Sequence, residues 1–91
     1  MTGTPRVYII IVNWNRREML VRCLTSIKHK TRYPDFGVIA VDNGSVDSSK
    51  KMIREDFPWV ELIENEINVG FAKANNLGIK RALEHEHTHL F

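Results

Sequence analysis

The stretch that decides the fold is VIAVDNGSVD, residues 38–47, an apolar run that ends in an acid and an amide before a Gly-Ser turn. The run Val38–Val41 has the length and composition of a strand buried on both faces of a sheet. Asp42 and Asn43 therefore stand at the carboxyl end of a predicted strand, and a helix is expected to start at about Asp47. Open parallel α/β sheets bind nucleotides at such strand ends.

A second stretch, VYIIIVNWN at residues 7–15, repeats this arrangement. The run Val7–Val12 is apolar and rich in β-branched residues, which is typical of a buried parallel strand. Asn13, Trp14 and Asn15 follow it directly. The two strands are thus predicted to deliver polar and aromatic groups to one edge of the sheet.

The rest of the chain alternates between apolar spacing typical of helices and apolar spacing typical of strands. Apolar spacing predicts helices over about 17–30, 47–57 and 69–83, and a third strand over 59–63. Alternating strands and helices imply right-handed parallel crossovers, with helices on both faces of the sheet. Residues 88–91 resemble the first step into a fourth strand, so the prediction is an α/β fold with a parallel sheet of three to four strands.

The same spacing predicts which side chains face the core. Small residues in the third helix would allow close approach to the sheet, and Cys23 is interpreted as a small core hydrophobe. The predicted inward-facing residues are Leu20, Cys23, Leu24, Ile27, Ile53, Phe57, Val60, Leu62, Phe71, Ala74, Gly78, Ile79, Ala82 and Leu83.

Composition limits the class of protein. The 91 residues are 43% hydrophobic and 26% charged, which is typical of one globular domain. A net charge of +2, with basic residues scattered among acids, does not favour nucleic acid as a partner. A single cysteine and the lack of a long apolar segment lead us to expect a protein of the reducing cytoplasm.

Each candidate site residue also has a structural interpretation. Asp42 could accept a hydrogen bond from a base or ribose, or it could satisfy main-chain N–H groups of the following turn. Trp14 could stack on a base, or cover the first helix. Asp47 is interpreted as a helix cap.

A third candidate segment is NVGFAKANNLGI, residues 68–79. Gly70 frees the backbone just before a helix whose amino end could face a phosphate, and Lys73, Asn75 and Asn76 supply donors on its first turns. The segment matches neither the dinucleotide fingerprint nor a Walker sequence.

Three histidines alternate near the end of the chain, at positions 85, 87 and 89. On a strand they would share one face, and on a helix His85 and His89 would lie one turn apart. Either geometry could place two imidazoles on a metal ion, although a solvated junction between helix and strand is the alternative.

Taken together, IIIVNWNRREMLVRCLTSI, VIAVDNGSVDSS and FPWVELIENEINVGFAKANNLGI resemble, in this order, the amino-terminal part of a family 2 glycosyltransferase. The similarity is greatest to the rhamnosyltransferase-like branch, and it implies the GT-A fold, whose nucleotide-binding half is a three-layer Rossmann-like unit. The resemblance also implies a nucleotide-binding role for Asn13, Trp14, Asn15, Asp42, Asn43, Gly70, Lys73, Asn75 and Asn76. Many relatives have Asp where this chain has Asn43, and Arg where it has Asn75.

The resemblance further implies a sugar transfer from a nucleoside diphosphate sugar to a hydroxyl of a glycan or lipid-linked acceptor, in polysaccharide or glycoconjugate synthesis. In such enzymes an Asp-rich motif after the fourth strand holds Mg²⁺ or Mn²⁺. We expect residues 1–91 to be a single partial domain that ends before this motif, binds nucleotide weakly, holds no metal and does not catalyse. The complete enzyme could act at the inner face of the membrane.

The unpaired edge of the first strand leads us to expect association with a second copy. Two other functions stay open from the residues alone. One is a stand-alone nucleotide-binding or regulatory module without catalysis, and the other is a structural interaction domain whose polar strand ends are only turns.

Overall fold

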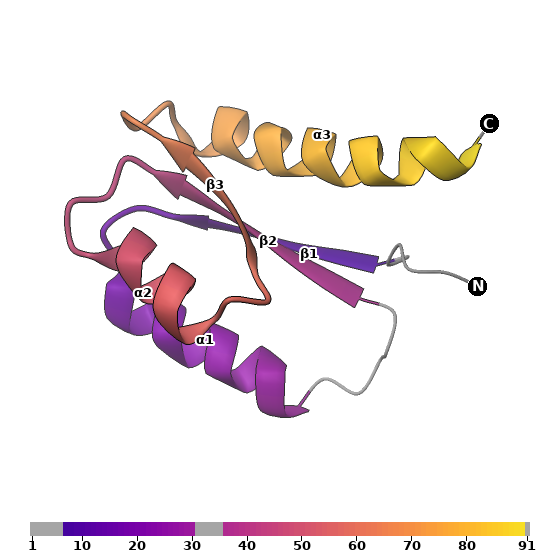
Figure 1. Cartoon of the computed structure of the whole chain (residues 1–91). Helices are drawn as coiled ribbons and strands as arrows, with labels where there is room; N and C mark the ends of the chain where they lie inside the picture. The colour runs from indigo at the N-terminus through magenta and orange to yellow at the C-terminus, as the bar shows by residue number, and fades with distance from the viewer. Residues whose placement is uncertain (1–6, 31–35, 91) are drawn as a thin grey trace.

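The computed structural model describes residues 7–30 and 36–90, except for the side chains of residues 30 and 86–90. The chain alternates regularly between strand and helix (Figure 1). The elements are β1 (Val7–Asn13), α1 (Arg17–Lys30), β2 (Phe36–Asn43), α2 (Ser49–Asp56), β3 (Glu61–Asn65) and α3 (Phe71–Leu90). The three strands form one parallel sheet in the order β1-β2-β3, which confirms the predicted α/β class.

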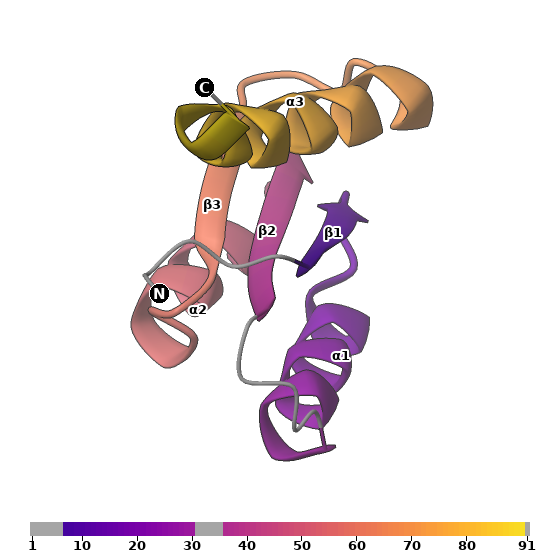
Figure 2. The same ribbon diagram turned by 90° about the vertical axis from the view of Figure 1, so that its right-hand side faces the viewer.

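Helices cover both faces of the sheet, with α1 and α2 on one side and α3 on the other (Figures 1 and 2). Successive side chains of a strand point to opposite faces, so alternate residues of β2 enter two separate cores. Val38 and Ala40 pack with α1 and α2, whereas Ile39 and Val41 pack with α3. The central strand β2 is therefore buried on both faces, as its continuous apolar sequence predicts.

The core beneath α3 depends on small residues. Ala74 is fully buried, and a β-carbon built on Gly78 would lie 2.5 Å from Ile10 Cγ2 and 3.3 Å from Val41 Cγ2. The helix axis consequently lies close to β1 and β2, which confirms the predicted close approach.

Several element boundaries differ from the sequence prediction, and two of the differences have a clear structural reason. Strand β3 begins at Glu61 instead of Trp59, because Trp59 packs edge-on against Phe57 in the turn after α2. Helix α3 continues to Leu90, so the predicted step into a fourth strand is wrong for residues 88–90. The segment after Gly78 contains no glycine or proline that would end the helix.

Several predicted core residues are exposed. On α3 the exposed fractions are 70% for Phe71, 40% for Ile79 and 57% for Leu83, and Cys23 on α1 is also exposed. The sheet contacts each helix along a stripe that is narrower than the apolar face of the helix. Phe71 is the first residue of α3, one turn before the first residue of this helix that is fully buried, Ala74. The other predicted inward residues are buried or partly buried. In the described part of the chain, no helix is long and apolar enough to cross a membrane.

Candidate functional site

The polar residues at the strand ends lie together at the carboxyl edge of the sheet. The strand register pairs Asn13 with Asp42 and Asn43 with Asn65. This edge carries the loops β1–α1, β2–α2 and β3–α3, the last of which leads into the amino end of α3 (Figure 1). The structure thus brings together groups that are far apart in the sequence.

Asp42 is fully buried and binds the turn that follows it. Its Oδ1 accepts a hydrogen bond from Asn13 Nδ2 at 3.0 Å, and its Oδ2 accepts one from the main-chain N–H of Ser45 at 2.9 Å. The turn interpretation of Asp42 is therefore seen directly. The Ser45 hydroxyl in turn accepts hydrogen bonds from Asn13 Nδ2 at 3.2 Å and from the main-chain N–H of Asn15 at 2.9 Å, which ties the β1–α1 loop to β2.

The β1–α1 loop is exposed at all three of its residues, Trp14, Asn15 and Arg16. Asn15 has a left-handed backbone (φ 51°), which asparagine tolerates better than most residues, and its Oδ1 accepts a hydrogen bond from Val46 N–H at 2.8 Å. The Trp14 side chain is 51% exposed, so a large part of its ring surface is accessible at this edge.

Asn43 is 2% exposed, and its side-chain amide makes four hydrogen bonds, with the end of β3 and with the β3–α3 loop. Its Nδ2 donates to Asn68 Oδ1 at 2.9 Å and to the Gly70 carbonyl at 3.3 Å. Its Oδ1 accepts from Asn65 Nδ2 at 3.1 Å and from Val69 N–H at 3.0 Å. Ser45, Asn65 and Asn68 were not among the predicted site residues, because a short polar side chain after a strand is an ordinary loop pattern.

The same edge requires glycine at one position of the β2–α2 loop. Gly44 has a φ of 88°, and a β-carbon there would lie 2.8 Å from the main-chain carbon of Ile67. The β2–α2 and β3–α3 loops are therefore in contact through their backbones. Val46 and Ile67, at the outer parts of these loops, are both exposed.

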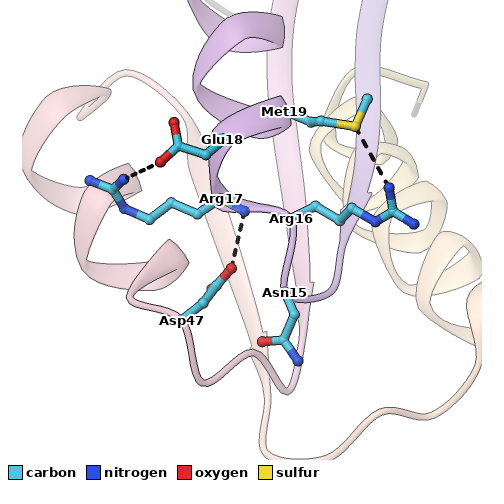
Figure 3. A pocket seen from close by; sticks show the side chains of 6 residues that line it. All are labelled: Asn15, Arg16, Arg17, Glu18, Met19 and Asp47. Carbon is cyan, nitrogen blue, oxygen red and sulfur yellow. Dashed lines mark hydrogen bonds and ion pairs between the residues drawn. The ribbon is translucent and has the colours of Figure 1, made fainter.

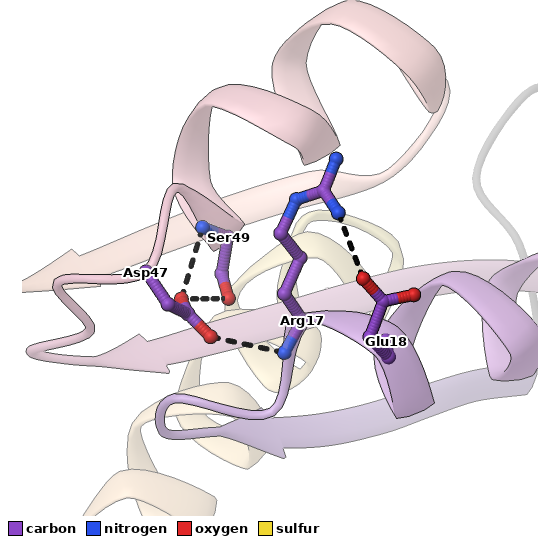
Figure 4. Close-up of polar contacts among 4 residues, drawn as sticks. All are labelled: Arg17, Glu18, Asp47 and Ser49. Carbon is purple, nitrogen blue, oxygen red and sulfur yellow. Dashed lines mark hydrogen bonds and ion pairs between the residues drawn. The ribbon is translucent and has the colours of Figure 1, made fainter.

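Asp47 lies between the amino ends of α1 and α2 (Figure 4). Its carboxylate accepts hydrogen bonds from the main-chain N–H of Arg17, and from the N–H and hydroxyl of Ser49. Partial burial raises the pKa of Asp47, but these hydrogen bonds outweigh it and hold the pKa below its ordinary value of 3.8. Asp47 therefore caps the amino end of α2, as predicted. The residue directly before α2 is Ser48, which has a left-handed backbone.

A surface hollow of about 400 Å³ lies beside this contact (Figure 3). Arg17 pairs with Glu18 at 3.2 Å, and the Arg16 guanidinium lies 3.7 Å from Met19 Sδ. Asn15 and Asp47 complete the lining of the hollow.

The amino end of α3 presents the third predicted segment. Gly70 has a φ of 89°, and apart from its two chain neighbours no described residue has a heavy atom within 4 Å of the position that a β-carbon would take. Lys73 and Asn76 are exposed, and Asn75 is half-buried. These donors stand on the first turns of a helix that begins above the carboxyl edge of the sheet (Figure 2).

The His85 side chain lies elsewhere and already has partners. Its ring stacks on Tyr8 with 5.8 Å between centroids, and a ring nitrogen lies 2.8 Å from Glu61 Oε1. Arg81 binds Glu61 Oε2 at 2.6 Å. Burial raises the pKa of Glu61, but Arg81 and His85 outweigh it and lower that pKa below 4.5. The side chains of His87 and His89 lie outside the described residues, and those described contain no group of three or more His, Cys, Asp or Glu suited to a metal ion.

Comparison with known proteins decides the family. The model of "Glycosyl transferase family 2" matches residues 8–84. The chain belongs to glycosyltransferase family 2. It is 37% identical over 79 residues to the teichoic acid poly(glycerol phosphate) polymerase of Staphylococcus epidermidis, covering 82% of this chain and 11% of that protein. It is 33% identical over 88 residues to the glycosyltransferase AglE of Haloferax volcanii, covering 90% of this chain and 29% of that protein.

A solved structure supports the same assignment. The mannosyltransferase PcManGT of Pyrobaculum calidifontis, in complex with GDP-Man and Mn²⁺, matches with a TM-score of 0.72 and 26% identity over 88% of this chain. The match covers 25% of the mannosyltransferase chain, so this glycosyltransferase chain spans only a part of its relatives. The predicted fold, the nucleotide-binding half of a GT-A domain, is confirmed.

Proposed function

We propose that this chain is the donor-binding half of a sugar transferase and that the carboxyl edge of its sheet binds the nucleoside diphosphate part of a nucleotide sugar. The observation that carries the proposal is the meeting of three loops and the amino end of α3 at one edge, in a family 2 fold. The mannosyltransferase of similar fold was solved with GDP-Man, which supports a donor of this class.

The exposed groups at the edge suit the two ends of such a donor. Trp14 offers an aromatic face for a base, whose stacking on such a ring is favourable. Lys73, Asn75 and Asn76 offer donors beside the positive end of the α3 dipole, which attracts a diphosphate. Asn13, Asp42 and Asn43 are buried, so they act in this proposal by holding the loops that carry the exposed groups.

A titration tests this binding. Amide chemical shifts are followed while UDP, dTDP or GDP is added to millimolar concentration, with the matching nucleoside as a control for the diphosphate. We expect shifts at Trp14 and in the first two turns of α3, and smaller ones with the nucleoside. If no nucleotide moves these resonances, the edge is not a donor site and the interaction-domain alternative gains support.

We propose that this chain alone holds no Mg²⁺ or Mn²⁺, which bind oxygen ligands, because the described residues contain no group of three or more His, Cys, Asp or Glu suited to a metal ion. Asp42 has no exposed surface, and both of its oxygens already accept hydrogen bonds. We assign no step to a metal in this chain, although the mannosyltransferase neighbour was solved with Mn²⁺. A metal would stabilise the leaving diphosphate in a complete enzyme of this kind.

We propose accordingly that residues 1–91 alone transfer no sugar, because the described residues contain no group of three or more His, Cys, Asp or Glu suited to a metal ion, and the Asp47 carboxylate beside the hollow already accepts hydrogen bonds from Arg17 and Ser49. An assay with nucleoside diphosphate sugars, Mg²⁺ or Mn²⁺, and a panel of acceptors measures nucleotide release. We expect no release above the uncatalysed rate. Turnover that Asp42→Ala abolishes would show that this chain contains more of the active site than we propose.

A second proposal concerns self-association through β1. Within the described residues β1 pairs with β2 alone, so no described strand lies along its other edge. Ile79 and Leu83 precede Arg81 and His85 by two positions, about 200° around the helix, so they lie on the side of α3 away from β3. The open edge of β1 and this apolar side of α3 form a surface that a second copy could cover.

A further inference from the structure

The side-chain amide of Asn43 is the only described side chain of β2 that binds the β3–α3 loop, and it makes four hydrogen bonds, three with this loop and one with Asn65 at the end of β3. Two of them are donated and two are accepted. At 2% exposure, the amide has no surface left for a ligand. Any influence on a bound nucleotide must therefore pass through the loop that it holds.

The carbonyl of Gly70 shows what this amide positions. It accepts one hydrogen bond from Asn43 Nδ2 at 3.3 Å and another from Ala74 N–H at 3.1 Å, which is the first helical hydrogen bond of α3. One oxygen thus joins the end of β2 to the start of α3. The amino end of this helix, with its donors, is fixed relative to the central strand at that atom.

Asn68 carries a parallel link between the same two elements. Its Oδ1 accepts hydrogen bonds from Asn43 Nδ2 at 2.9 Å and from Gly70 N–H at 2.7 Å. Both groups of Gly70 are thereby held by Asn43, one directly and one through Asn68. Since Gly70 has a left-handed backbone, these bonds also hold the turn that directs the chain into α3.

This arrangement requires an amide at position 43. A carboxylate has the same shape and keeps the two accepting positions, but it cannot donate to Asn68 Oδ1 or to the Gly70 carbonyl. Each of those contacts would then join two oxygens. A buried polar group that loses its partner keeps the free-energy cost of leaving water. This cost is larger than the net stabilisation that an ordinary hydrogen bond provides.

We propose that Asn43 is a positioning residue for donor binding, which holds the amino end of α3 where its donors face the diphosphate. The inference rests on the proposed function, since it concerns the same nucleotide. It assigns Asn43 no contact with the ligand, in contrast to the direct role that the family resemblance implies.

The test compares Asn43→Asp with Ile67→Asp, which adds a carboxylate to an exposed position of the contacted loop without removing a hydrogen bond. Affinity for UDP, dTDP or GDP is measured by amide shifts, together with hydrogen exchange of residues 68–74. At neutral pH we expect Asn43→Asp to weaken binding by about 10-fold or more and to speed exchange in this segment. Ile67→Asp should change the affinity by no more than about 2-fold, through charge alone.

The pH profile tests whether the missing donor causes the weaker binding. A protonated carboxyl regains one O–H donor, so the deficit of Asn43→Asp, relative to the unaltered chain at each pH, should shrink as the pH falls. The deficit of Ile67→Asp also disappears when its carboxylate is protonated, but it should stay within about 2-fold at every pH.

A second pair of variants serves if Asn43→Asp does not fold. Asn68 is exposed, and in the hydrogen bonds described above its side chain acts only as an acceptor, through Oδ1. Asn68→Ala should weaken nucleotide binding by about 5-fold, and Asn68→Asp should restore it, because a carboxylate keeps both accepting positions.

The outcomes distinguish the two proposals. If the unaltered chain binds and Asn43→Asp binds equally well at neutral pH, positioning by Asn43 is wrong while the donor site stands. The same holds if Asn68→Ala and Asn68→Asp both bind like the unaltered chain. If the unaltered chain binds no nucleotide, both proposals fail.

Discussion

The carboxylate of Asp47 accepts a hydrogen bond of 3.0 Å from the main-chain N–H of Arg17, the first residue of a helix thirty positions earlier. The same carboxylate also binds the first N–H of α2. One side chain therefore satisfies unpaired donors at the amino ends of two helices, which normally need separate caps.

This contact predicts a dependence of stability on pH. The pKa of Asp47 is lower in the folded state, so its contribution is complete above the ordinary value of 3.8 and is lost as the pH falls through the lower folded value. Urea unfolding at several pH values should show Asp47→Asn losing less stability in this acid range than the unaltered chain. Glu18→Gln, at a largely exposed side chain, is the control for removing one carboxylate at this helix end. Equal slopes for Asp47→Asn and the unaltered chain would contradict the double cap.

Asp42→Asn should destabilise the fold by about 1–3 kcal/mol. The new amide can still accept from Asn13, but its NH₂ group would face the N–H of Ser45, which now donates to Oδ2. Chemical denaturation measures the change, with the exposed Asp56→Asn as a matched substitution that should be nearly neutral. A stable Asp42→Asn variant with weakened nucleotide binding would instead favour direct contact between Asp42 and the ligand.

Gly78→Ala should also destabilise the fold, by about 1–3 kcal/mol, although alanine is the better helix former. The added methyl would lie 2.5 Å from Ile10 Cγ2, so α3 or β1 must move. Ile10→Ala removes the obstructing atom. In a double-mutant cycle, the cost of Gly78→Ala should therefore be much smaller in the Ile10→Ala background. Additive costs would show that the two residues do not meet.

The open edge of β1 should cause self-association at high micromolar concentration, which light scattering or sedimentation can measure. Leu83→Lys places a charge beside this edge and should shift the chain toward monomer. Ile67→Lys makes the same type of change at an exposed apolar residue of the β3–α3 loop and should not. A monomer at all concentrations, or equal effects of the two lysines, would reject β1 as the interface.

The order and type of the elements could be predicted from sequence because the periodic signals are long. The six-residue apolar run of β1 and the run before Asp42 in β2 left little choice but a buried parallel strand. The exposure of Ile79 and Leu83 could not be predicted this way. Their spacing is helical, but how wide a face the sheet covers depends on how close the helix comes, and Gly78 sets that distance.

The position of the candidate site could be predicted from the sequence, but the hydrogen bonds that connect its loops could not. Strand ends in a parallel sheet share an edge, so the neighbourhood of Asn13 and Asp42 followed from topology. The roles of Asn65 and Asn68 depend on hydrogen bonds between loops, which have no sequence period. The burial of Asn43 likewise comes from the β3–α3 loop closing over it.

Trp14, Val46 and Ile67 differ from the rest of this edge in that their side chains are exposed while the backbones beside them are fixed. Anchoring comes from Ser45 for the first loop, from Asn15 for the second, and from the contact at Gly44 for the third. Substitution of an exposed side chain that makes none of these contacts itself changes the free energy of unfolding by only about 0.5 kcal/mol. The edge therefore separates a constant frame from replaceable surface positions, so an altered preference for the base can arise at Trp14, or be engineered there, without redesigning the fold.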